Sequence, residues 1–185
     1  MKRIVLVFGL IAGVILSVSM VVSLQFHDAI GFGPVAMAIG YASMVLAFLL
    51  VYFGVRAYRD EVAGGTVGFG RAFAVGGLIA LVASLCYVAT WQVIYYRFEP
   101  DFMVKYQAHV LEKARASGAS AEALARQKAD MESFAKLYRN PAFNAAVTFA
   151  EPLPVALIIA LVSAGVLSRK RREDEGLIAP VRVST

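Results

Sequence analysis

Several residue types that carry protein chemistry are scarce in this chain of 185 residues. It has one cysteine, Cys86, and two histidines. A single cysteine excludes a disulfide framework and a cysteine-based zinc site, and two histidines are too few for a histidine metal cluster. We therefore expect no metal and no cofactor. Charged residues make up only 17%, against about 25% in a typical soluble domain, which excludes disorder and argues against an ordinary soluble globule.

The hydrophobic residues are instead gathered into four long runs. Residues 4–24, 35–55 and 72–96 contain no charge, and residues 142–167 contain only one, Glu151. A helix needs about 20 apolar residues to cross a hydrocarbon core of about 30 Å. No run alternates polar and apolar residues as a barrel strand would. The sequence predicts an all-α fold, an integral membrane four-helix bundle.

The basic residues are distributed unevenly between the connections. The start of the chain, the connection 56–71 and the segment 169–172 are basic, whereas residues 25–34 contain no lysine or arginine. In the long connection 97–140 the basic and acidic residues nearly balance. The positive-inside rule therefore predicts two cytoplasmic termini, with residues 97–140 extracytoplasmic, in a bacterial inner membrane. This distribution also accounts for the net charge of +5, so the charge does not indicate nucleic-acid binding.

The first run could also belong to a signal peptide, because it follows a basic start. It is longer than the 7–15 residues of a typical signal core, and no small-residue cleavage site closes it. We expect it to remain as the first crossing. The expected organisation is three transmembrane helices in 1–98 (about 4–24, 35–55 and 72–96), an extracytoplasmic helical hairpin in 99–140, a kinked fourth crossing in 141–170 and a basic tail in 171–185.

The expected hairpin contains two helices that are separated by a break at 117–119. Ser120 is placed to cap the second helix, which runs to about residue 139. This second helix has an apolar face, which either packs on the rest of the molecule or the membrane surface, or binds a partner. The residues of that face are Leu124, Met131, Phe134 and Tyr138.

Small residues recur at a spacing of four in three of the runs. Such stripes let helix backbones approach closely in lipid, where no hydrophobic force drives helices together. The spacing does not distinguish contacts within one chain from contacts in a homo-oligomer. The stripes are Gly9, Gly13 and Ser17; Ala72, Gly76, Ala80 and Ser84; and Ala156, Ala160 and Ala164.

Two further clusters mark the ends of the crossings. The connection 56–71 contains Gly64, Gly65, Gly68 and Gly70, which we interpret as a tight turn into the third helix. A phosphate cradle is the alternative, but no strand precedes the loop and no Gly-Lys-Ser/Thr sequence ends it. Aromatic residues at the end of the third run predict a membrane-interface belt, with a ligand-stacking platform as the alternative. They are Trp91, Tyr95, Tyr96 and Phe98.

Glu151 is the most unusual residue of the sequence, because ionisable groups within a crossing are costly and are functional candidates. Pro152 and Pro154 follow it and predict a kink, beside which Thr148 supplies a hydroxyl. Eighteen residues separate Glu151 from Arg169, about 27 Å of helix, so the carboxylate is expected just inside the outer interface. It is either held by a hydrogen-bonding or cationic partner, or it is a site for a cation or proton. The candidate partners are Arg97, the first choice, and Lys105, Arg139, Tyr95 and Tyr96.

Several segments together resemble the domain-of-unknown-function 4199 family over roughly residues 1 to 170. They are 53–60 and 64–73 for the inner loop, 100–106 for the outer loop, and 131–134, 137–141 and 148–154 in the last third. The resemblance implies a bacterial integral membrane protein with four helices and no established activity. It supplies no substrate, and the tail after Arg172 departs from the pattern.

No catalytic constellation is present: there is no intramembrane acidic pair, no HExxH motif and no serine in a nucleophile elbow. We therefore expect a non-enzymatic protein of the lipid bilayer that acts through self-association or a partner in the membrane. The alternative is a small oligomeric transporter or channel with Glu151 as its ion or proton site. A membrane enzyme is the least favoured class.

Overall fold

The computed structural model describes residues 1–25 and 33–168, and every regular element in these two ranges is an α-helix. The expected all-α class is therefore confirmed, whereas the expected tail at 171–185 lies outside the described residues. The helices, in chain order, are α1 (Lys2–Gln25), α3 (Pro34–Glu61), α4 (Phe69–Arg97), α5 (Phe102–Ala116), α6 (Ala121–Tyr138), α7 (Pro141–Ala150) and α8 (Leu153–Leu167).

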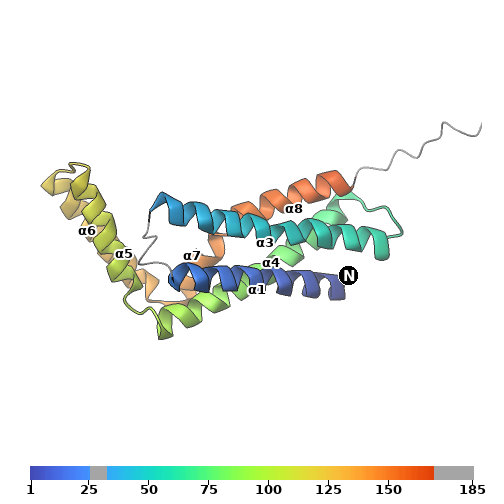
Figure 1. Cartoon of the computed structure of the whole chain (residues 1–185), viewed down its shortest axis with the longest axis horizontal. Helices are drawn as coiled ribbons and strands as arrows, with labels where there is room; N and C mark the ends of the chain where they lie inside the picture. Colours follow the sequence, from blue (N-terminus) through green and yellow to red (C-terminus); the bar gives the residue numbers. More distant parts are fainter. Residues whose placement is uncertain (26–32, 169–185) are drawn as a thin grey trace, which may run out of the picture.

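Three of these helices, α1, α3 and α4, are long and apolar enough to cross a membrane. The pair α7 and α8 passes the same test when it is taken together, although its two helices are bent by 41° at the break between them. Length and composition therefore allow up to four spans in the described chain. Helices α1, α3, α4 and α8 lie lengthwise beside one another, and α5 and α6 project as an antiparallel pair from one end (Figure 1).

The first small-residue stripe lies in the interface between α1 and α4. A Cβ atom added to Gly9 would lie 2.7 Å from a side-chain carbon of α4, and one added to Gly13 would lie 2.6 Å from the Cβ of Cys86. One turn further along, the hydroxyl oxygens of Ser17 and Thr90 are 2.8 Å apart. The two helices are therefore in backbone-to-side-chain contact along this stripe, which only small residues allow.

The other two stripes are also used inside the molecule. A Cβ atom on Gly76 would lie 3.1 Å and 3.3 Å from side chains of α3, namely Val51 and Val55, and 3.5 Å from the Cβ of Ala160 in α8. The remaining members are buried, and they are Ala72, Ala80, Ser84, Ala156 and Ala164. The stripes thus form contacts within one chain. Their spacing alone did not distinguish such contacts from contacts between copies in a homo-oligomer.

The glycine cluster closes one helix and starts the next. Gly64 and Gly65 have φ angles of +68° and +89°, a region that residues with a Cβ rarely adopt. The backbone N–H of Gly65 donates to the carbonyl oxygen of Arg59 at 2.8 Å, which ends α3. Gly68 is the N-cap of α4 in an extended conformation, and Gly70 lies inside α4. Two of the four glycines therefore form the turn, and the other two belong to the next helix.

Capping residues determine where α6 and α7 begin. Ser120 precedes α6, and its hydroxyl accepts a hydrogen bond from the N–H of Ala123 at 3.2 Å, as its position predicts. Asn140 precedes α7, and its side-chain oxygen accepts from the N–H of Ala142 at 2.9 Å. Pro141 occupies the first turn of α7, where its missing N–H leaves no hydrogen bond unmade.

Candidate functional site

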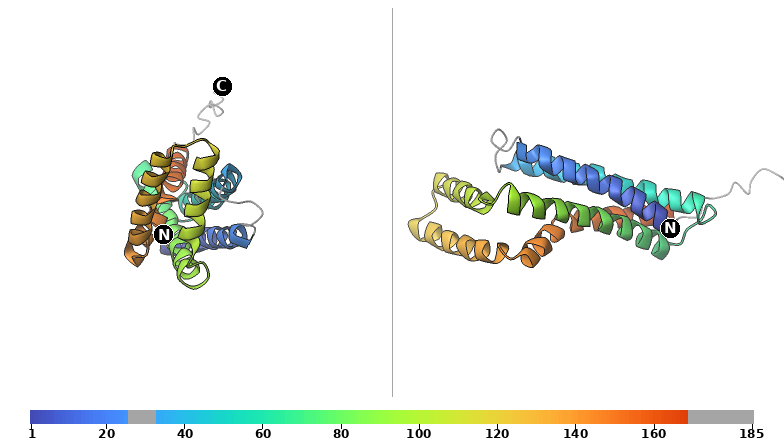
Figure 2. Two further views of the ribbon diagram at one scale, coloured as in Figure 1. Left: turned by 90° about the vertical axis from the view of Figure 1, so that its left-hand side faces the viewer. Right: turned by 90° about the horizontal axis from the view of Figure 1, so that it is seen from below.

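The break between α7 and α8 separates two packing environments. Helix α7 ends at Ala150 and α8 begins at Leu153, so Glu151 and Pro152 lie between them. Helix α8 packs against α3 and α4, whereas α7 packs against α4 and α6. Figure 2 shows α7 turning away from the line of α8. The bend expected from Pro152 and Pro154 is present, and it separates α7 from α3.

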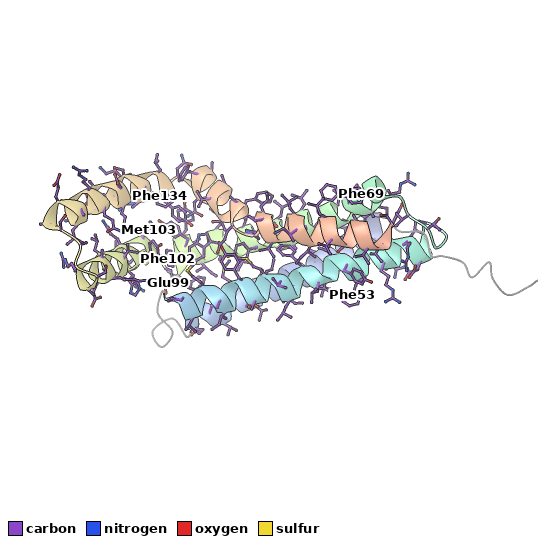
Figure 3. All side chains as sticks on the ribbon, turned by 90° about the horizontal axis from the view of Figure 1, so that it is seen from above. Phe53, Phe69, Glu99, Phe102, Met103 and Phe134 are labelled. Carbon is purple, nitrogen blue, oxygen red and sulfur yellow. The ribbon has the colours of Figure 1, made fainter. Side chains whose placement is uncertain are left out.

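A cavity of about 560 Å³, here named the Glu151 cavity, lies between α7 and α3 and is lined by residues of both helices. Its walls come from α1, α3, α4, α5, α6 and α7. Aromatic and sulfur-containing side chains line the end near α5 and α6, where Phe134 lies on one side and Phe102 and Met103 lie on the other (Figure 3). Glu151, Thr148 and Tyr87 line the same cavity and give it a polar part.

Glu151 is held by a tyrosine. The hydroxyl of Tyr87 donates to Oε2 of Glu151 at 3.0 Å. Within the described part of the chain, no ion pair joins Glu151 to a lysine or arginine. The expected pairing with Arg97 is therefore replaced by a hydrogen bond to a neutral side chain.

The position of Tyr87 along α4 explains why Arg97 is not the partner. Ten residues, or about 15 Å of helix, separate Tyr87 from Arg97. The expectation placed the end of the third helix at the level of Glu151, but α4 continues beyond that level alongside α7. In the other direction, Tyr87 lies sixteen residues, about 24 Å, from Arg71.

A second polar pair lies one turn further along α4. The side-chain amide of Gln92 donates to Oδ1 of Asn144 at 2.7 Å, and Asn144 has 0% of its surface exposed. The hydroxyl of Thr148 donates to the carbonyl oxygen of Asn144 at 2.8 Å, so this residue of the candidate site supports α7. Gln92 and Asn144 were not among the site residues expected from the sequence. Their position as carboxamides inside otherwise apolar runs is the pattern that would have found them.

The aromatic residues at the end of α4 divide into two groups. Trp91 and Tyr95 are only 8% and 4% exposed, whereas Phe98 is 73% exposed. The first two are therefore core residues and not members of an interface belt, because α5 and α6 cover them. The indole N–H of Trp91 donates to the hydroxyl of Tyr138 at 2.9 Å, and its ring meets that of Phe102 edge to face at 4.9 Å.

The hydroxyl of Tyr138 belongs to this covered region. It lies near the end of α6, and burial raises its pKa above the ordinary value for tyrosine. The hydroxyl therefore stays protonated at neutral pH and remains a neutral partner for Trp91. In the described residues, no group of three or more histidine, cysteine, aspartate or glutamate side chains could hold a metal ion.

The apolar helices, their internal small-residue contacts and the part-buried carboxamide pair define an all-helical protein of membrane type. The chain belongs to the DUF4199 family, described as a protein of unknown function, whose model matches residues 7–169. This confirms the family that the sequence resembles. No curated protein and no solved structure matches the chain.

Proposed function

We propose that the protein is a non-enzymatic, multi-pass protein of the bacterial inner membrane that acts by binding a small apolar molecule in the Glu151 cavity. The cavity itself is the observation that supports this proposal most strongly. Its volume of about 560 Å³ lies within the range of about 300–1,000 Å³ that is typical of small-molecule sites. Its mostly apolar walls with a few polar groups also match such sites.

Two features favour binding over the other functions considered. The small-residue stripes are occupied by contacts within the chain, so they offer no free face for self-association. On the far side of the break, Phe48, Val51 and Ile79 are fully buried and pack the space between the helices. A continuous path for a transported ion would have to cross this packed part. The alternative, a transporter with Glu151 as its ion or proton site, therefore requires a second conformation.

The proposed topology has four crossings, formed by α1, α3, α4 and the bent pair α7–α8, with both termini in the cytoplasm. Helices α5 and α6 then form the extracytoplasmic hairpin. The basic residues at the start of the chain, in the connection 56–71 and after α8 support this orientation. With Arg71 at the inner surface, the distance of about 24 Å along α4 puts Tyr87 and Glu151 in the outer leaflet.

Cysteine labelling in intact spheroplasts tests the topology. In a Cys86→Ser background, an impermeant maleimide should label Arg115→Cys and Arg126→Cys before lysis, and Glu175→Cys only after lysis. The opposite pattern would reverse the orientation and place the cavity in the inner leaflet.

The binding proposal can be tested through Trp91, the one tryptophan of the chain, which lines the cavity. Titration of the purified protein in lipid nanodiscs with 1-adamantanemethanol, a compact neutral molecule, should change the tryptophan emission in a saturable way. Saturation should be absent from empty nanodiscs.

A pair of glycine variants assigns the signal to the cavity. Gly40 lines the cavity and has no atom within 4 Å of an added Cβ, so Gly40→Leu should extend into the cavity without disturbing the helix packing. Gly77, which also has no atom within 4 Å, is outside the cavity lining and provides the matched control Gly77→Leu. Gly40→Leu should abolish saturable binding and Gly77→Leu should retain it. Equal binding by both variants would show that the ligand does not occupy this cavity.

A further inference from the structure

We infer that the Glu151 cavity selects an organic cation, namely a compact apolar molecule that carries a protonated amine, with Glu151 as the counter-ion. This inference rests on the proposed function, because it specifies the chemical class of the molecule that the cavity binds. It assigns to Glu151 the recognition of charge, and to the aromatic and methionine side chains the recognition of the apolar body.

The charge balance of the cavity is the first argument. Among the described residues that line it, Glu151 is the only one with an aspartate, glutamate, lysine, arginine or histidine side chain. Tyr87 donates to one carboxylate oxygen, Oε2, and no ion pair with a described residue uses the other. Glu151 lines the cavity, and part of its surface is exposed. A carboxylate in an apolar setting is costly unless a cation compensates it, and a cationic ligand supplies that compensation.

The aromatic walls are the second argument. A cation is attracted to the face of an aromatic ring within about 6 Å. Tyr87, Trp91 and Tyr138 all line the cavity, so aromatic rings from two helices line the same space as the carboxylate. A neutral ligand would gain from the apolar area of these rings but not from their electrostatic attraction.

The methionines are the third argument. Four of the six methionines of the chain line the cavity, and they are Met20, Met37, Met44 and Met103. Methionine side chains are unbranched and polarizable and adapt to differently shaped apolar groups. The cavity therefore specifies the charge of its ligand more strictly than the shape of its apolar part. Anionic amphiphiles such as fatty acids are excluded, because their headgroup would meet Glu151 with a like charge.

Three probes with one apolar cage separate the contributions of charge and shape. They are 1-adamantanemethylamine, 1-adamantanemethanol and 1-adamantaneacetic acid, which are cationic, neutral and anionic at pH 7.5. We expect the amine to bind at least about tenfold more tightly than the alcohol, and the acid to bind more weakly than either. Binding is measured by the emission of Trp91 in nanodiscs made from zwitterionic lipid, so that the membrane itself attracts no cation.

Substitution of the carboxylate shows whether Glu151 is the source of the preference. Glu151→Gln keeps the shape of the side chain and an acceptor for Tyr87, so it should bind the amine no more tightly than it binds the alcohol. The matched control is Glu122→Gln, which removes a carboxylate that is 76% exposed on α6 and paired with Arg126. This control should retain the full preference.

The outcomes distinguish the two proposals. Equal affinities of the wild type for all three probes, or an unchanged preference in Glu151→Gln, would overturn the assignment of a cation and leave the binding function standing. A failure of all three probes to bind would overturn the proposed function itself. If Glu151→Gln does not fold, the order of the three affinities in the wild type still decides the question.

Discussion

The contact between α1 and α4 at Gly13 makes a quantitative prediction about stability. A Cβ atom at this position would lie 2.6 Å from the Cβ of Cys86 and 2.8 Å from its Sγ. Carbon atoms in favourable contact are about 3.5–4.0 Å apart, so Gly13→Ala forces the helices to separate by about 1 Å. A Cβ atom cannot rotate away as the end of a long side chain can, so the strain has to spread along the interface.

The expected magnitude follows from two opposing effects. Overpacking of a well-packed core costs about 1–3 kcal/mol. The higher helix propensity of alanine offsets about 1 kcal/mol of that cost. Gly40→Ala is the matched control, because it gains the same propensity and meets no atom within 4 Å. The free energy of unfolding should therefore be about 1–3 kcal/mol lower for Gly13→Ala than for Gly40→Ala.

Thermal unfolding in detergent micelles, followed by the emission of Trp91 and by circular dichroism, measures this difference. A chain of this size changes its midpoint by about 2–4 °C for each kcal/mol. The double variant Gly13→Ala/Cys86→Gly removes the opposing Cβ and should recover much of the loss beyond what the two single variants predict by addition. If Gly13→Ala unfolds at the same temperature as Gly40→Ala, α1 and α4 are not in close contact at Gly13.

Two further predictions concern the polar groups on α4. Without ligand, Glu151→Gln should leave the thermal midpoint unchanged or raise it, because it removes a charge that no cation balances and keeps an acceptor for Tyr87. A decrease of more than about 1 kcal/mol in the free energy of unfolding would mean that the carboxylate has a stronger structural partner than Tyr87. Asn144→Leu should lower the unfolding free energy by about 1–3 kcal/mol because it leaves the amide of Gln92 without its acceptor, and Gln92→Leu added to it should restore part of that loss. Strict additivity of the last two changes, measured by the same unfolding assay, would show that the two carboxamides do not interact.

The sequence predicts the secondary structure well because each signal is local. Long uncharged runs define α1, α3 and α4, Ser120 caps the helix that begins at Ala121, and two prolines separate α7 from α8. These features depend on neighbours within about one helical turn. The sequence therefore carries them without any information about how the helices pack.

The candidate site is harder to predict because it depends on the register between distant helices. Glu151 and its proline kink are evident from the sequence, but the partner of Glu151 depends on how far α4 extends beside α7. A hydrophobic run shows where the apolar residues end, and not which residue of one helix lies level with a residue of another. Arg97 was therefore expected where the structure has Tyr87, 64 positions from Glu151 in the chain. The burial of Trp91 and Tyr95 escaped prediction for the same reason, since it depends on where α5 and α6 fold back.

If α7 and α8 form one crossing as proposed, the break at Glu151 also affects how the polypeptide enters the bilayer during synthesis. Helix α7, with 10 residues, is about 15 Å long, and α8, with 15 residues, is about 22 Å long, so neither can cross a hydrocarbon core of about 30 Å alone. In the proposed topology, the insertion machinery would therefore have to accept both halves as one segment, with a glutamate and two prolines near its centre. Helix α4 leaves the ribosome before α7 and carries Tyr87 and Gln92, the hydrogen-bond donors for Glu151 and Asn144. We expect the last crossing to be stabilised in the bilayer by the helices already inserted, so that its integration is the step at which membrane insertion and tertiary folding coincide.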